Sequence, residues 1–278
     1  MFKPNLFGSG QRRAFIRCLL LIAPTILLPT GSCIAQDHDE DHDHLHFSHP
    51  LVTESPTPDT KIRLDFIAFR VSGDFPASLN AVRLEGEYAF THALSLAVVT
   101  PFVWITEPAT DRASGFGDVE LALKAASLAF ADRGFLVGGG LSTSLPTGSD
   151  SKGIGSSHIV EVEPFVDVGY KRDALELVGF ARVSSTFRRQ AGEEQERNLA
   201  FDFSSLYHIS PRLEGLFELT TTRALVGPER GVPQTFVAPG VKIYPFANRQ
   251  IMFGASVELG TGAITDARGY LLSGFYHF

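Results

Sequence analysis

The chain has 278 residues, a formal net charge of −7 and two cysteines. This length suits one large β domain or two ordinary ones. The acidic balance, with no basic stripe interleaved with aromatic residues, excludes a general nucleic-acid-binding protein. The mean hydropathy of +0.07 is too low for a bundle of membrane helices. Past the amino terminus there is no uninterrupted apolar run of the ~20 residues that a spanning helix needs.

The amino terminus has the layout of a secretory signal peptide. Three arginines precede the apolar run Cys18–Leu28, and small residues follow it. We expect residues 1–35 to be removed by cleavage after Ala35. Two alternatives remain, because Gln11–Arg17 resembles a twin-arginine signal and Leu28–Cys33 is a poor lipoprotein motif. In every case both cysteines are removed or lipid-modified, which excludes a disulfide framework.

Residues 36–59 form a polar, acidic and His-rich stretch that three prolines interrupt near its end. Their composition predicts a flexible leader. Imidazole and carboxylate groups are ligands for Zn, Ni, Cu or Co, and a dense tract can fold around such an ion. We therefore expect transition-metal binding, with a merely solvated acidic leader as the alternative. The candidate metal ligands are His38, His42, His44, His46 and His49.

From residue 60 to residue 278 the sequence alternates between apolar and polar residues, which is typical of strands with two different faces. In the first strand, Leu64 and Phe66 alternate with Arg63 and Asp65. We count twelve such segments of roughly ten residues, the length that a tilted strand needs to cross a bilayer. Residues 60–278 are therefore predicted to be an all-β, antiparallel, up-and-down transmembrane barrel of about twelve strands. The segments lie at 62–69, 82–90, 94–104, 118–125, 135–145, 159–170, 175–187, 199–208, 213–223, 235–244, 251–259 and 270–278.

Short and long connections alternate between these segments. This asymmetry is expected when one rim of a barrel faces the periplasm and the other faces outside. An even number of strands then places both termini on the short-turn, periplasmic side. The short turns are near 91–93, 129–134, 171–173, 210–212 and 247–249, and the long loops near 72–80, 106–116, 146–157, 188–198, 224–234 and 260–269.

The last segment, Tyr270–Phe278, places aromatic and apolar residues on one face and ends in phenylalanine. It resembles the carboxy-terminal signal that the outer-membrane assembly machinery reads. The alternative is a secreted β-sandwich or soluble barrel, whose apolar face would point inward. Loop asymmetry, export and the terminal strand favour a barrel in contact with the outer-membrane lipid of a Gram-negative-type bacterium.

If the apolar face meets lipid, the charged residues opposite it line the lumen. A net acidic lumen favours cations or neutral small molecules over anions. The alternative is that these charges pair across strands and confer little selectivity. The predicted lining residues are Asp65, Arg83, Glu85, Glu87, Glu120, Lys124, Glu161, Glu163, Asp167, Arg182 and Glu218.

Enzymatic motifs are weak, and we expect no enzyme activity and no catalytic residues. A His followed two residues later by a Ser, as in outer-membrane phospholipases, occurs only at His46/Ser48 and His208/Ser210. The glycine-rich stretch at 146–157 lacks the spacing of a phosphate-binding loop and fits an exposed loop better.

Several short stretches resemble one family, the outer-membrane transporter-like proteins associated with the phenol meta-cleavage pathway. They are Glu87–Leu96, Gly115–Lys124, Leu145–Gly148 and Val237–Lys242, within a similarity spanning most of 60–278. The resemblance implies a barrel that passes small, often hydrophobic or aromatic, molecules across the outer membrane. Residues His44–Lys61 fall outside the family pattern and look like the start of a variant subgroup.

Three functions follow from this reading. The first is an outer-membrane channel or transporter-like barrel that passes small-molecule or cation solutes and carries a metal-binding periplasmic leader. The second is a non-conducting metal-binding or anchoring protein. The third, more remote, is a lipid hydrolase.

Overall fold

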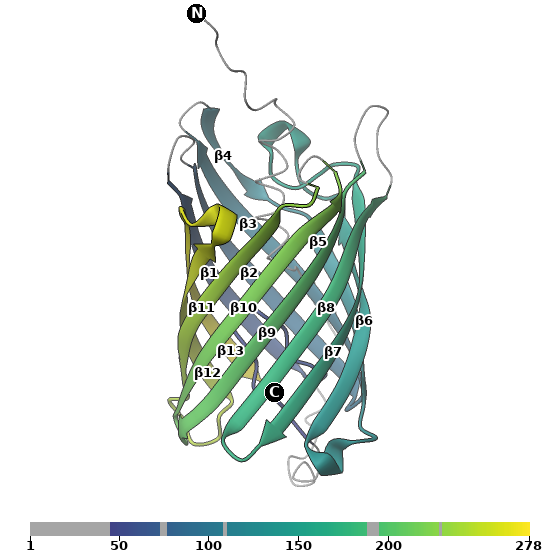
Figure 1. Ribbon diagram of the computed structural model, residues 1–278, viewed down its shortest axis with the longest axis vertical. Coiled ribbons are helices and arrows are strands. Elements are labelled where there is room, and N and C mark those ends of the chain that lie inside the picture. Colours follow the sequence, from purple (N-terminus) through teal and green to yellow (C-terminus); the bar gives the residue numbers. More distant parts are fainter. Residues whose placement is uncertain (1–44, 73–76, 108–109, 188–194, 228–229) are drawn as a thin grey trace, which may run out of the picture.

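The computed structural model describes residues 45–72, 77–107, 110–187, 195–227 and 230–278. Figure 1 shows one continuous wall of tilted strands, with short 3-10 helices at its ends. No helix within these residues is long and apolar enough to span a membrane. The strands are β1 (Lys61–Val71), β2 (Ala77–Thr91), β3 (Leu94–Glu107), β4 (Thr110–Phe116), β5 (Val119–Ser127), β6 (Phe135–Leu145), β7 (Val160–Arg172), β8 (Leu175–Phe187), β9 (Arg197–Ser210), β10 (Leu213–Val226), β11 (Pro233–Ile243), β12 (Ile251–Thr261) and β13 (Ala267–His277), and the 3-10 helices are η2 (Ala131–Arg133), η3 (Asp150–Lys152) and η4 (Gly262–Ile264).

The sheet closes into a barrel because β1 pairs with both β2 and β13. All strand pairs are antiparallel, and β3 pairs with β5 along its first half and with β4 along its second half. β4 and β5 therefore occupy one position in the wall. Counting them as one, the thirteen strands of the sheet make a closed barrel of twelve, as the sequence predicted.

The break between β4 and β5 lies opposite Pro101 of β3. Gly117 donates its N–H to the Pro101 carbonyl at 3.0 Å, but proline has no N–H to return the second bond of the pair. The predicted long connection near 106–116 is wrong over most of its length, because these residues finish β3 and form β4. Parts of the loops expected at 72–80, 224–234 and 260–269 also belong to strands, because β2, β10, β11, β12 and β13 extend beyond the segments predicted from alternation.

Side chains along the strands alternate between the outer surface and the interior. In β1, Leu64 and Phe66 are exposed, whereas Arg63 and Asp65 are buried. The same arrangement recurs around the barrel, with large apolar side chains outside and charged ones within. A soluble sandwich or soluble barrel has the reverse arrangement, so the alternation observed is that of a membrane barrel.

β1 begins and β13 finishes at the end of the barrel where the connections β2–β3, β7–β8 and β9–β10 span two residues each. We call this the short-turn end. Lys61, the first residue of β1, pairs there with His277, the last residue of β13.

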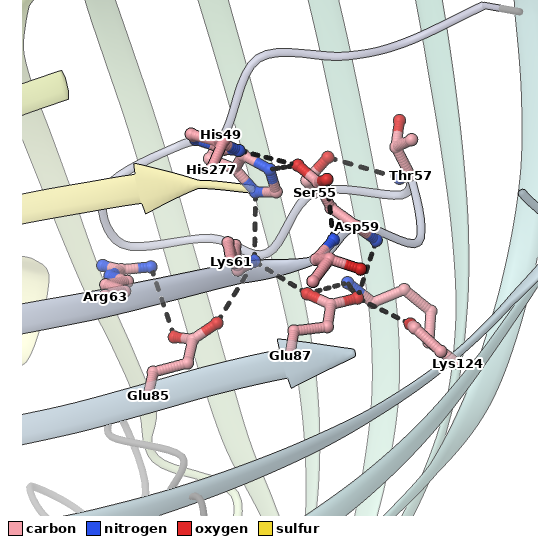
Figure 2. A network of polar contacts seen from close by, with 12 residues as sticks. His49, Ser55, Thr57, Asp59, Lys61, Arg63, Glu85, Glu87, Lys124 and His277 are labelled. Atoms are coloured by element: carbon pink, nitrogen blue, oxygen red, sulfur yellow. Dashed lines mark hydrogen bonds and ion pairs between the residues drawn. The ribbon is translucent and has the colours of Figure 1, made fainter. Parts of the chain in front are cut away.

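Residues 45–60, which we call the plug segment, enter the barrel interior at the short-turn end before β1 starts (Figure 2). Phe47 and Leu51 are fully buried. Phe47 lies against Gly169 of β7 and Leu51 against Gly254 of β12, on distant parts of the wall. The expected flexible leader, 36–59, is thus an ordered inserted segment from residue 45 onward. Residues 36–44 and the expected signal peptide, 1–35, lie outside the described residues.

Candidate functional site

Glu218 of β10 is the main polar anchor of the plug segment. Its carboxylate accepts the N–H groups of Leu51, Val52 and Thr53 at 3.2, 3.0 and 2.9 Å. The hydroxyls of Thr53 and Ser204 each donate to it at 3.0 Å. Successive backbone amides that converge on one acceptor form an anion-binding nest. These donors satisfy a fully buried carboxylate, which would otherwise be costly to bury.

Glu176 of β8 and Glu214 of β10 form a second anchor. The Ser48 N–H donates to Glu176 at 2.7 Å, and the Ser48 hydroxyl donates to Glu214 at 3.2 Å. Lys242 of β11 pairs with Glu214 at 2.5 Å and donates to the His49 carbonyl at 3.0 Å. The interior charges therefore bind the backbone of the segment as well as one another.

Two apolar contacts complete the seat of the plug segment. Phe47 packs with Val178, and Leu51 packs with a cluster from β9 to β13. A Cβ atom at Gly169 would lie 2.6 Å from the Phe47 ring, and one at Gly254 would overlap Leu51. These two strand glycines are therefore required because the segment approaches the wall so closely.

A paired belt of charges lies beside the plug segment on β1, β2 and β5 (Figure 2). Lys61 Nζ is 3.1 Å from Glu85 and 2.8 Å from Glu87. Lys124 Nζ reaches Glu87 at 3.2 Å. The belt consists of Lys61, Arg63, Asp65, Arg83, Glu85, Glu87 and Lys124, all buried. The predicted lining residues of the belt face the interior. They pair across strands, which is the arrangement given above as the alternative to a cation-selective lumen.

A second interior group, the acidic cluster, has fewer basic partners. Arg182 Nη1 lies 3.6 Å from Glu163, and its Nη2 lies 3.1 Å from Asp202. On β8, Arg182 is six residues beyond Glu176, so the cluster lies nearer the long-loop end than the plug anchors do. We define it as Glu120, Glu161, Glu163, Asp202 and Arg182. Asp167 is buried nearby on β7, and neither of its carboxylate oxygens has a hydrogen-bond partner among the described residues.

Three histidines meet one carboxylate oxygen where the plug segment joins β1. Asp59 Oδ2 lies 3.3 Å from His46 Nε2, 2.8 Å from His49 Nε2 and 2.9 Å from His277 Nδ1. Figure 2 shows His49, Asp59 and His277 together above Lys61, whose Nζ donates to His49 Nδ1 at 3.1 Å. We call His46, His49, Asp59 and His277 the His–Asp cluster.

Two groups of the cluster have shifted pKa values. Burial and the nearby Lys61 charge lower the pKa of His49 well below its usual value, against the opposing effect of Asp59. Burial alone would raise the pKa of Asp59, but hydrogen bonds from His277, His46 and His49 hold it far below its usual range. At neutral pH the cluster therefore offers a neutral imidazole and an ionised carboxylate, the forms that bind metal ions.

The structure brings together only part of the predicted metal set. His46 and His49 lie in the cluster, whereas His38, His42 and His44 lie outside the described residues. Sequence reasoning missed Asp59 and His277. His277 could have been found from the alternation of the last strand. It follows the exposed Tyr276, so its side chain belongs to the inward face.

The His–Ser pairs are used in other ways. His208 directs Nε2 to Glu176 and Nδ1 to Glu214, both at 2.8 Å, so its ring serves the plug anchor instead of Ser210. Ser48 donates to the same two carboxylates. The glycine-rich loop at 146–157 folds over Asp118, which accepts the N–H groups of Gly148 and Ser156.

Comparisons with known proteins agree with this architecture. The crystal structure of the COG4313 outer membrane channel from Pseudomonas putida F1 is similar with a TM-score of 0.63 and 12% identity, over 80% of this chain and 96% of that one. The NanC porin gives 0.53 and 15%, over 77% and 100%. The translocator domain of the autotransporter NalP from Neisseria meningitidis gives 0.55 and 10%, over 79% and 88%. At these identities the likeness shows the fold, that of outer-membrane β-barrels.

No curated protein matches the chain significantly. A family model described as "Putative MetA-pathway of phenol degradation" matches residues 67–267, which is most of the barrel. The chain therefore belongs to this family, as the sequence motifs suggested.

Proposed function

We propose that this protein is an outer-membrane channel that passes small cationic or neutral solutes. Its apolar outer face suits a bilayer and its charged inner face suits an aqueous path. The acidic cluster is the observation that supports a cationic or neutral solute, because carboxylates that line a pore favour cations over anions. We expect residues 1–35 to direct export of the chain, and the outer-membrane assembly machinery to insert the barrel. In the usual orientation of such barrels, the short-turn end faces the periplasm.

The plug segment is part of the same proposal. It occupies the interior at the short-turn end and is held there by buried carboxylates and two apolar contacts. We propose that it narrows the path and sets the size of solute that passes. Its histidines give this part of the channel an affinity for transition-metal ions.

Conductance across a planar bilayer tests the proposal. We expect discrete single-channel steps and a reversal potential in a KCl gradient that shows preference for K⁺. A double change, Glu161→Gln with Glu163→Gln, should reduce that preference. Asp132→Asn, at a side chain that is 76% exposed on the short-turn rim, is the matched control and should leave it unchanged. Anion preference in the unmodified protein would refute the proposed solute class.

The second candidate is a non-conducting metal-binding or anchoring protein. The observation that favours it is the tight seating of the plug segment within the barrel, with Phe47 and Leu51 both fully buried. If the intact barrel and a variant lacking residues 45–59 are both silent in the bilayer, this candidate replaces the channel.

A further inference from the structure

The His–Asp cluster has an unusual geometry for a set of hydrogen bonds. Three imidazole nitrogens surround a single oxygen, Asp59 Oδ2, at 2.8 to 3.3 Å. The other oxygen, Oδ1, accepts the N–H of Thr60 at 2.8 Å, which fixes the carboxylate with Oδ2 toward the rings. The cluster thus gathers four atoms that can serve as metal ligands, from the plug segment and the last strand.

The three distances from Asp59 Oδ2 to the imidazole nitrogens are close to those between neighbouring ligand atoms of a tetrahedral metal site. Ligands bound at about 2.0–2.1 Å to a four-coordinate Zn²⁺ lie roughly 3.3 Å from one another. The potential ligand atoms of His46, His49 and Asp59 already lie within 4.8 Å of one another. His277 adds a fourth, 2.9 Å from Asp59. His277 is outside that group of three, so its ring must turn toward His46 and His49 to complete the ligand set.

We propose that His46, His49, Asp59 and His277 together bind one transition-metal ion of the Zn²⁺, Ni²⁺ or Co²⁺ class. The ion would join the plug segment, which supplies three ligands, to β13, which supplies the fourth. It would therefore hold the segment in the barrel as well as being bound by it. This inference deepens the metal-binding part of the proposed function and does not depend on conduction.

The surroundings suit both entry and retention of an ion. The His46 side chain is 52% exposed, so the cluster opens to solvent on that side. His49 is nearly fully buried, and its ring lies 5.0 Å from that of His277, so neither ring is free to turn away. Imidazole is a good ligand for Zn, Ni and Cu ions, and one carboxylate completes a common ligand set.

The Lys61 ammonium opposes binding of the ion. It donates to His49 Nδ1, which leaves the proton on Nε2, the atom that faces Asp59. Binding of an ion at Nε2 therefore requires the ring proton to move to Nδ1, and Lys61 must then release that nitrogen. Glu85 and Glu87 keep the Lys61 ammonium paired when it does so, since both already lie within 3.1 Å of it.

Cobalt titration of the full chain, refolded in detergent without a polyhistidine tag, tests the site. We expect one Co²⁺ per chain with the intense visible bands of tetrahedral coordination, and displacement by Zn²⁺. His277→Ala and Asp59→Asn should each weaken binding at least about tenfold, since even outer-shell substitutions cost about 10- to 100-fold. His46→Ala, at an exposed side chain, repeats the test with little risk to folding, and the heat-modifiable mobility of each variant confirms a folded barrel.

Two matched variants separate this site from other sources of binding. A triple change of His38, His42 and His44 to Ala should leave the tetrahedral bands intact. His158→Ala, at a histidine that also pairs with an aspartate, should do the same. Loss of the bands in the triple variant, or their persistence in folded His277→Ala, would overturn the inference whatever the conductance of the protein.

Discussion

Glu218 shows how one residue can position a whole segment. Its carboxylate accepts three consecutive amides, so a neutral amide in its place would turn one acceptor into a donor facing other donors. We expect Glu218→Gln to weaken docking of residues 45–60 by about 1–3 kcal/mol, the cost of an unsatisfied buried group. Hydrogen exchange of that segment should rise accordingly. Asp173→Asn, at a side chain 91% exposed, is the control, and equal exchange in both variants would contradict the role of Glu218.

Asp150 gives the loop between β6 and β7 a dependence on pH. Burial alone would raise the pKa of Asp150, but hydrogen bonds from Ser157, His158 and Ser156 lower it to about 2. The unfolded value is about 3.9. The folded value is the lower one, so Asp150 stabilises the loop fully above about pH 4, and this contribution is lost as the pH falls through about 2.

Asp150→Asn should therefore reduce the protection of residues 146–158 from hydrogen exchange at neutral pH. Strong acid should have the same effect on the unmodified loop. Hydrogen exchange, corrected for the intrinsic effect of pH, measures both. If protection of the loop is unchanged in the variant and between pH 5 and pH 2, Asp150 does not hold it.

At the scale of elements, the plug segment depends on space that two strand glycines leave. Gly169→Val would place side-chain atoms where the Phe47 ring lies, because even a Cβ would be 2.6 Å away. We expect the segment to leave its seat while the barrel stays folded. The matched control is Gly179→Val on β8, where a Cβ makes an ordinary contact at 3.5 Å. Chymotrypsin cleavage after Phe47 or Leu51 should increase only in Gly169→Val. Protection of both sites in that variant would argue against the proposed docking of the segment.

The elements themselves were largely predictable from sequence. Strands such as Phe135–Leu145 and Leu175–Phe187 were located correctly, because lipid on one side and charge on the other impose period-two alternation. β4 was missed because its residues, Thr110–Phe116, are polar and glycine-containing, without that alternation. The plug segment was missed for another reason. Its composition is that of a disordered chain, and its order comes from contacts with six or more strands that no local pattern encodes.

The same limit applies to the candidate site at the scale of the whole molecule. The sequence identified the charged inner face, including the Glu85 and Glu163 positions, from alternation alone. It could not pair His49 with His277, 228 positions further along the chain, because barrel closure and insertion of the plug bring them together. Nor could it distinguish the paired belt from the acidic cluster, since the partner of each charge depends on register between strands.

The whole barrel should survive without its plug. The wall is held by its own ladder of hydrogen bonds and by its apolar outer face, neither of which involves residues 45–59. Replacing these residues with a Gly/Ser linker of equal length would expose Glu218 to water and remove the amides that now balance its charge. We therefore expect a folded barrel with a larger conductance and a stronger preference for cations than the unmodified protein. Single-channel current and reversal potential measure the two effects separately. A larger conductance with unchanged selectivity would show that the segment obstructs the path without masking its charge, and no change in either would show that solutes do not pass the seat of the plug.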